Sequence, residues 1–106
     1  MTYTVIFSTA AEADLFAIYD YIAERAGAGI ALHFVESIEV YCLGFANMPE
    51  RGMRRDDLRP GLRTVGFRRR ATILFEVDQT ARRVVIHGVY YAGRSCLLYT
   101  SPSPRD

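Results

Sequence analysis

The sequence contains no lysine, and all 13 of its basic residues are arginines. A lysine whose pKa is lowered can carry a proton, whereas arginine stays protonated at any working pH. Arginine instead offers a fixed positive charge and a planar set of donors that match carboxylates and phosphates. The basic residues of this chain are therefore suited to binding anions and poorly suited to acid–base chemistry.

Cysteine and histidine are scarce. The chain has two cysteines, Cys42 and Cys96, and two histidines, His33 and His87. Two cysteines do not make a disulfide framework, and the spacings typical of metal ligands are absent. Cys42 falls within an apolar helical pattern, so we expect it to be a buried small hydrophobic residue. We expect no metal and no cofactor.

Long apolar runs are missing as well. No uninterrupted run approaches the roughly 20 residues that span a bilayer. Residues 1–5 show no basic region followed by an apolar core, as a secretory signal would. Hydrophobic residues make up 50% of the chain and charged residues 24%, which is ordinary for a soluble globular protein. We expect a cytoplasmic protein with no membrane partner.

Charge is distributed unevenly along the chain. Residues 1–50 carry one arginine and seven acidic residues, whereas residues 51–94 carry eleven arginines and four acidic residues. The formal net charge of +1 therefore hides an acidic half followed by a basic half. Such an asymmetry suggests an anionic partner, either a nucleic acid or an acidic protein segment.

The first half of the sequence predicts a strand and two helices. Residues 3–7 are short and rich in β-branched and aromatic side chains, which favours a strand. Residues 9–12, Thr-Ala-Ala-Glu, have the form of a capping box and predict the start of a helix. Its apolar residues recur at helical spacing until residues 27–29, Gly-Ala-Gly, interrupt the pattern. A second helical pattern follows and stops before Met48-Pro49.

The second half predicts a polar loop over residues 50–61 and then three strands. The strands span residues 62–67, 71–77 and 84–91, with short connections that favour antiparallel pairing. The order β-α-α-β-β-β predicts an α+β fold in which a helical hairpin packs on a mainly antiparallel four-stranded sheet. We expect a core of Val5, Phe7, Leu15, Ile18, Ile22, Val35, Ile38, Phe45, Ile73, Phe75, Val85 and Val89.

A chain of 106 residues is long enough for one domain. We assign residues 1–94 to that domain. Residues 95–106 have no hydrophobic period and end in a Ser-Pro-Ser-Pro segment, so we expect a disordered or non-native tail.

The order of elements and several short segments resemble the ParE branch of the RelE/ParE toxins. The segments are residues 3–8, 13–15, 20–23, 48–52, 60–63, 65–66, 73–78 and 89–94. The resemblance implies the toxin of a bacterial type II toxin–antitoxin pair, neutralised by a small antitoxin that wraps a helix and an extended segment over it. It also implies that the pair binds its operator DNA through the antitoxin complex.

The superfamily divides by mechanism. RelE-like relatives cleave messenger RNA on the ribosome, which needs a proton acceptor, a proton donor and cations for the phosphate. For that reaction the candidate catalytic residues are Arg63, His87, Tyr91 and Arg94, with Tyr91 at the position of a histidine in relatives. ParE-like relatives bind DNA gyrase and hydrolyse nothing. Because the chain lacks a complete acid–base set, we favour the gyrase branch and keep the endonuclease as the alternative.

Binding residues are expected mainly in the basic half. Arg51, Arg54, Arg55 and Arg59 lie near Asp56 and Asp57, and we expect local ion pairs there. Residues 68–70 are three consecutive arginines whose mutual repulsion an acidic partner would offset. Strand alternation places one tyrosine of the pair Tyr90-Tyr91 in the core. The expected antitoxin- or target-binding set is Arg63, Arg68, Arg70, Tyr90, Tyr91 and Arg94.

One further interpretation concerns the end of the domain. Ser95 stands where relatives carry an aspartate, so an inert relic of a toxin, or an interaction module without toxicity, is a third reading of the sequence.

Overall fold

A computed structural model describes residues 2–91 of the chain. Arg94 and the predicted tail lie outside the described residues. The described part begins with a strand and two helices, β1 (Thr4–Phe7), α1 (Thr9–Ala26) and α2 (Ala28–Leu43), and a 3-10 turn, η1 (Gly44–Ala46). Four strands follow: β2 (Met53–Arg54), β3 (Leu62–Phe67), β4 (Ala71–Asp78) and β5 (Arg83–Tyr91).

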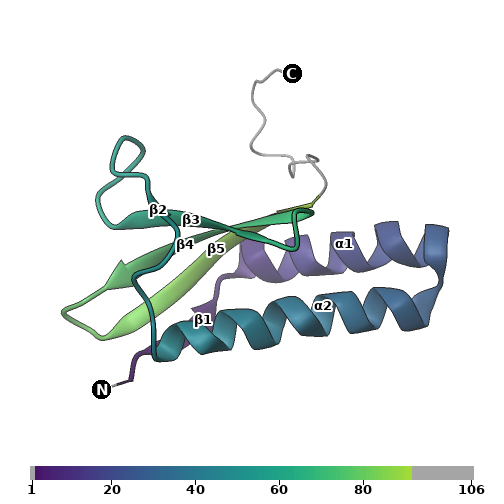
Figure 1. Cartoon of the computed structure of the whole chain (residues 1–106), viewed down its shortest axis with the longest axis horizontal. Coiled ribbons are helices and arrows are strands. Elements are labelled where there is room, and N and C mark those ends of the chain that lie inside the picture. The colour runs from purple at the N-terminus through teal and green to yellow at the C-terminus, as the bar shows by residue number, and fades with distance from the viewer. Residues whose placement is uncertain (1, 92–106) are drawn as a thin grey trace.

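The strands form one mixed sheet with the order β1-β5-β4-β3-β2. β1 runs parallel to β5, and the other neighbouring pairs are antiparallel. The two helices form a hairpin that lies along one side of the sheet (Figure 1). The predicted α+β fold is confirmed, with one difference. The sheet has five strands because β2, only two residues long, forms inside the predicted loop 50–61.

The helix boundaries follow from local capping. Ser8, one residue before the predicted cap, has extended backbone angles, and its side chain accepts a hydrogen bond from the Ala11 N–H at 3.0 Å. α1 ends at Gly27, whose φ of 100° is accessible to glycine at little cost. The second helix starts directly at Ala28, so the predicted three-residue break contracts to Gly27 alone.

The second helix is unusually apolar. Residues Ala28–Ala46 form a 19-residue helical segment with a mean hydropathy of 1.3, long and apolar enough by composition to cross a membrane. The segment contains Glu36 and Glu39, and one face of it, including Ile38 and Cys42, is fully buried in the core. Only 28% of the segment is buried, however, so much of its apolar surface faces outward.

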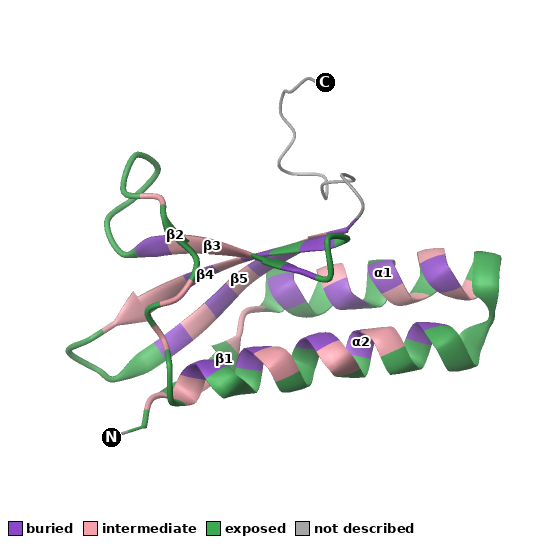
Figure 2. Ribbon diagram, in the orientation of Figure 1, coloured by how far each residue is buried: buried purple, intermediate pink, exposed green. Residues whose placement is uncertain are grey.

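The core lies between the hairpin and the sheet (Figure 2). Most of the expected residues line it, and Cys42 is fully buried as expected, which raises the pKa of its thiol to about 12 through desolvation and the nearby Glu39. The prediction for Val85 is wrong. Val84 and Ile86 are buried in its place, and a β-bulge near His87 then shifts the alternation so that Val89 and Tyr91 face the core.

Candidate functional site

The arginine segment 68–70 forms the turn between β3 and β4. The Arg70 N–H donates to the Phe67 carbonyl at 3.1 Å, and both central residues have positive φ, 53° at Arg68 and 60° at Arg69. This is the pattern of a type I′ turn, which favours Asn-Gly because other side chains are strained there. Arg68 and Arg69 therefore occupy two positions whose left-handed backbone conformation disfavours any residue with a Cβ. Such strain concentrates at functional sites.

The surroundings of these arginines contain no compensating carboxylate within residues 2–91. The Arg68 guanidinium lies 5.0 Å from the Phe67 ring centre, and Arg70 Nη1 donates to the Tyr91 hydroxyl at 3.5 Å. No ion pair joins Arg68, Arg69 or Arg70 to an acidic residue in the described part of the chain. The positive charge of the turn is therefore not paired with a carboxylate of the described residues.

The arginines of the 50–61 loop behave differently. Arg54 pairs with Asp56 at 2.8 Å and Arg55 pairs with Asp57 at 3.0 Å, as expected from the sequence. The backbone N–H of Gly61 and the Arg54 side chain hold the pKa of Asp56 below its usual value. These exposed pairs shape the loop, and because solvent screens them they contribute little to stability.

Arg63 lies far from the arginine turn, near the opposite end of β3. Its backbone is in register with Phe75 of the neighbouring strand β4. Its side chain donates a hydrogen bond from Nη1 to the Arg51 carbonyl at 3.2 Å. The Arg51 guanidinium in turn lies 5.3 Å from the Tyr41 ring centre. The structure therefore divides the predicted binding arginines between two places, with Arg68 and Arg70 at one and Arg63 at the other.

The two tyrosines at the end of β5 face opposite ways. Tyr91 is 9% exposed and packs edge-on against Tyr21 and Phe34, with ring centres 5.7 and 5.3 Å apart. It is the member of the pair that lies in the core. Tyr90 is half-buried on the other side of the sheet, where its hydroxyl approaches Gly88.

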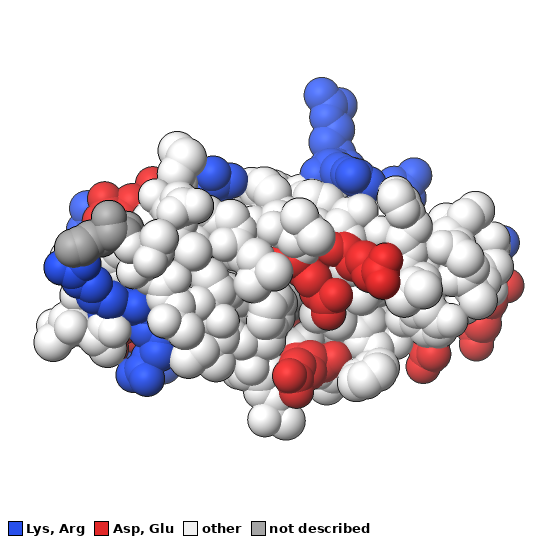
Figure 3. All heavy atoms as spheres, turned by 90° about the horizontal axis from the view of Figure 1, so that it is seen from below, with Lys and Arg blue, Asp and Glu red and all other residues white. Residues whose placement is uncertain are grey.

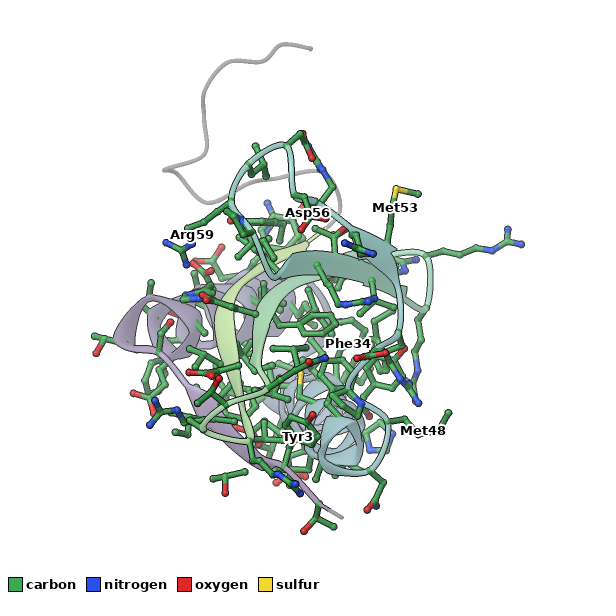
Figure 4. The ribbon with its side chains drawn as sticks, turned by 90° about the vertical axis from the view of Figure 1, so that its left-hand side faces the viewer. Tyr3, Phe34, Met48, Met53, Asp56 and Arg59 are labelled. Carbon is green, nitrogen blue, oxygen red and sulfur yellow. The ribbon has the colours of Figure 1, made fainter. Side chains whose placement is uncertain are left out.

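His87 belongs to a cluster on the sheet face that the helices leave uncovered. Its Nε2 lies 2.9 Å from Glu76 Oε1, and Arg59 Nη2 approaches the same oxygen at 2.7 Å. Arg59 contributes to the cluster from the loop that precedes β3. Met53, in the short strand β2, instead points into solvent (Figure 4). The pKa of Glu76 is lowered mainly by the hydrogen bond to His87 and to a smaller extent by the pairing with Arg59.

Asp14 has a structural role that its sequence pattern did not indicate. Acidic residues of an amphipathic helix usually lie on its solvated face. Asp14 Oδ2 instead accepts the Val89 backbone N–H at 2.9 Å, on the edge of β5 that β1 leaves unpaired. The aspartate therefore satisfies an edge N–H and fixes α1 against β5. No group of three potential metal-ligating side chains occurs among the described residues.

Comparison with known proteins identifies the family of this chain. Residues 5–94 match the family model described as the ParE toxin of the type II toxin–antitoxin system parDE. The chain belongs to the ParE toxin family. No curated protein sequence matches it.

Two solved structures are similar to this ParE-family chain. The chromosomal ParDE toxin–antitoxin system of P. aeruginosa matches with a TM-score of 0.71 and 26% identity, over 83% of this chain and 94% of that one. The RelBE2 toxin–antitoxin complex of Mycobacterium tuberculosis matches with a TM-score of 0.63 and 23% identity, over 86% of this chain and 92% of that one. The second supports the fold alone, and together they confirm a RelE/ParE-type architecture.

The Glu76 cluster gives this ParE-family domain a measurable pH dependence. Because the folded-state pKa of Glu76 is lowered, its pairing stabilises the fold above the ordinary glutamate pKa and is lost as the pH falls through the folded-state value. We expect Glu76→Gln to flatten the acid limb of the stability profile below about pH 4.5. Urea unfolding between pH 3 and 7 measures this effect, and an unchanged acid limb would contradict it.

Proposed function

We propose that this ParE-family toxin acts by binding DNA gyrase, without cleaving nucleic acid. One observation supports the proposal above the others. The sequence suggests His87 and Tyr91 as the groups for proton transfer, but the sheet separates them. His87 lies on the open face beside Glu76, and Tyr91 is buried beneath the opposite face with its hydroxyl near Arg70. A proton donor and acceptor drawn from this pair cannot meet on one substrate.

The experiment for this proposal uses purified gyrase and plasmid DNA. We expect the toxin to inhibit supercoiling and to cause cleaved plasmid to accumulate. Addition of the cognate antitoxin should prevent both effects. Gyrase activity that is unaffected by a stoichiometric excess of folded toxin would contradict the proposal.

The same proposal includes a cognate antitoxin as the neutralising partner, with operator DNA bound only through the antitoxin complex. Both similar structures are toxin–antitoxin systems. We assign antitoxin or target contacts to Arg63, Arg68, Arg70, Tyr90 and Arg94. We expect Tyr91 to contribute indirectly, because its hydroxyl accepts a hydrogen bond from Arg70. The uncompensated charge of the arginine turn is the feature that an acidic antitoxin segment would neutralise.

Charge reversal tests the arginine turn directly. We expect Arg68→Glu combined with Arg70→Glu to weaken antitoxin binding at least about 100-fold, because both charges change sign at one site. Isothermal titration calorimetry measures the change. Arg25→Glu, an exposed arginine at the far end of α1, is the matched control and should stay within about threefold of the parent. Equal losses from both variants would count against a specific role for the turn.

A second candidate function follows from the Glu76–His87–Arg59 cluster. A carboxylate, an imidazole and a guanidinium within hydrogen-bonding distance could serve as base, acid and phosphate clamp for RNA cleavage. Compared with the catalytic residues expected from the sequence, this cluster has Glu76 and Arg59 beside His87 instead of Tyr91 and Arg63. The cluster faces away from the helices, where a large substrate has access.

Transcript cleavage on translating ribosomes tests this alternative. If the endonuclease function holds, Glu76→Gln and His87→Ala should each reduce cleavage by about 100-fold or more while circular dichroism stays unchanged. The gyrase proposal expects no cleavage by the unmodified toxin. Cleavage that persists in both variants would exclude the cluster as its catalytic centre.

A further inference from the structure

Arg51 does not form the local ion pair that its position in the sequence suggests. The nearby aspartates pair with Arg54 and Arg55 instead. Glu50, the neighbour of Arg51 in the chain, accepts a hydrogen bond from the Gln79 amide at 2.7 Å. In the described part of the chain, no carboxylate lies within ion-pairing distance of the Arg51 guanidinium. Its charge is therefore not balanced by the residues that the structure describes.

The Arg51 guanidinium packs against aromatic rings where α2 ends. Its central carbon lies 5.3 Å from the Tyr41 ring centre and 5.4 Å from the Phe45 ring centre. A cation is attracted to a ring at this distance, but the ring does not replace the hydrogen-bond acceptors that a guanidinium loses when it leaves water. The rings therefore fix the position of Arg51 without satisfying its N–H donors.

Two adjacent donors of this guanidinium lack a good acceptor. Nε is buried and has no hydrogen-bond partner among the described residues. Nη2 donates to the Met48 sulfur at 3.6 Å, and a thioether is a weak acceptor. A buried donor without an acceptor costs free energy, so such a group in a folded protein calls for an explanation.

Met48 covers these donors without being buried itself. The residue is 61% exposed and lies at the surface of the molecule (Figure 4). A methionine side chain is unbranched and has three rotatable bonds, so it adopts other rotamers readily. Rotation of Met48 away from Arg51 would open both Nε and Nη2 to a ligand.

A second arginine adds positive charge beside Arg51. Arg63 is held to the Arg51 backbone carbonyl by its Nη1 at 3.2 Å, and it forms no ion pair with another described residue. Figure 3, which views the hairpin side, shows basic side chains at the left-hand end of the molecule, whereas the middle of the hairpin is acidic. The end of the molecule at which α2 stops thus attracts an anion.

The geometry of the donors restricts the class of anion. Nε and Nη2 point the same way from a planar guanidinium, and two such parallel donors match the two oxygens of a carboxylate. Because Nε is buried, the acceptor must enter past Met48 on a narrow stem. The carboxylate of an aspartate or glutamate side chain meets that requirement. A phosphodiester does not, because a sugar flanks it on either side.

We propose that the Nε–Nη2 edge of Arg51 binds the carboxylate of one aspartate or glutamate side chain of a protein partner, with Met48 as a displaceable cover. The carboxylate supplies acceptors for both donors, and the Met48 side chain turns into solvent. The site is separate from the arginine turn. Its chemistry follows from Arg51 and its surroundings and does not depend on gyrase being the target.

Nuclear magnetic resonance of the whole toxin tests the site, because each arginine Nε–H gives its own signal. The probe is N-acetylglutamate N-methylamide, titrated at constant ionic strength. We expect a saturable shift of the Arg51 signal, with a dissociation constant at least about tenfold lower than at Arg25. Arg25 is the matched control, because it also lies over a ring, that of Tyr21, but already donates to a carbonyl and pairs with Glu24.

Two variants and a second probe test the parts of the site. Met48→Ala removes the cover and should tighten binding at least about threefold, because no side chain has to be displaced. Arg51→Lys removes the parallel donors, so the backbone amides of residues 48–52 should stop responding to the probe. Dimethyl phosphate has the same charge as the probe and represents a nucleic-acid backbone. It should bind at least about tenfold more weakly.

Four results would count against the proposal. The absence of a saturable shift at Arg51, or an equal affinity at Arg25, would refute the site. Equal or tighter binding of dimethyl phosphate would overturn the assignment to a carboxylate. Unchanged affinity in the Met48→Ala protein would overturn the role of Met48 as a cover.

Discussion

Replacing the turn residues Arg68 and Arg69 by asparagine and glycine is expected to stabilise the fold and to weaken antitoxin binding. Both arginines have positive φ in a type I′ turn, and Arg68→Asn with Arg69→Gly supplies the residues that this turn prefers. A left-handed conformation costs an ordinary residue about 1–2 kcal/mol, so we expect the free energy of unfolding to rise by about 1–2 kcal/mol. For a domain of this size that corresponds to an increase in Tm of about 4–8 °C per kcal/mol.

The two readouts separate a binding role from a structural one. Chemical denaturation measures the stability, and calorimetry measures the affinity for antitoxin, which we expect to fall about tenfold or more. Arg82→Gly is the matched control, because Arg82 also has positive φ, 55°, but lies in the β4–β5 turn. That variant should gain stability without losing affinity. A stabilised Arg68/Arg69 variant that binds antitoxin like the parent would show that the strained arginines do not serve antitoxin binding.

Gly52→Ala is expected to destabilise the domain by about 3 kcal/mol, a large effect for a surface residue. Gly52 has a φ of 76°, and a Cβ there would overlap the Thr64 carbonyl oxygen and lie 2.8 Å from the Val65 Cβ. The backbone must therefore shift away from β3, which breaks the short pairing of β2. Arg51 and Arg54, on either side of Gly52 and Met53, would move with it.

Urea unfolding measures the loss, with Gly29→Ala as the control. Gly29 lies in α2 with no atom near its missing Cβ, so alanine should stabilise the helix by about 0.5–1 kcal/mol. A Gly52→Ala protein as stable as the parent would mean that the β2 edge is more tolerant than its geometry indicates.

The sequence predicts most of this fold because its local signals agree with one another. The helical periods and the glycine at position 27 define the hairpin, whose second helix ends at Leu43 before a 3-10 turn, and the short connections define the antiparallel strands. β2 escapes prediction because a two-residue strand has no hydrophobic period. Regular alternation from Val89 would place Val85 in the core, and the bulge near His87 breaks that alternation.

The candidate site was less predictable because its members meet only through tertiary structure. Arg59 and Glu76 are 17 residues apart and His87 lies 11 residues further along, so no spacing motif links them. Asp14 and the Val89 N–H are 75 residues apart. The three consecutive arginines are visible in the sequence, but the left-handed conformations of Arg68 and Arg69 are not, since Arg-Arg carries no signal for a type I′ turn.

The most direct test of the mechanism is to express the toxin inducibly in bacteria and to measure DNA integrity and messenger-RNA integrity in the same arrested cells. Gyrase binding predicts double-strand breaks and an induced DNA-damage response, with transcripts intact. Rapid transcript cleavage with undamaged DNA would contradict it and would favour the endonuclease built on Glu76 and His87. Absence of growth arrest from soluble, folded protein would contradict both and leave an inert relic.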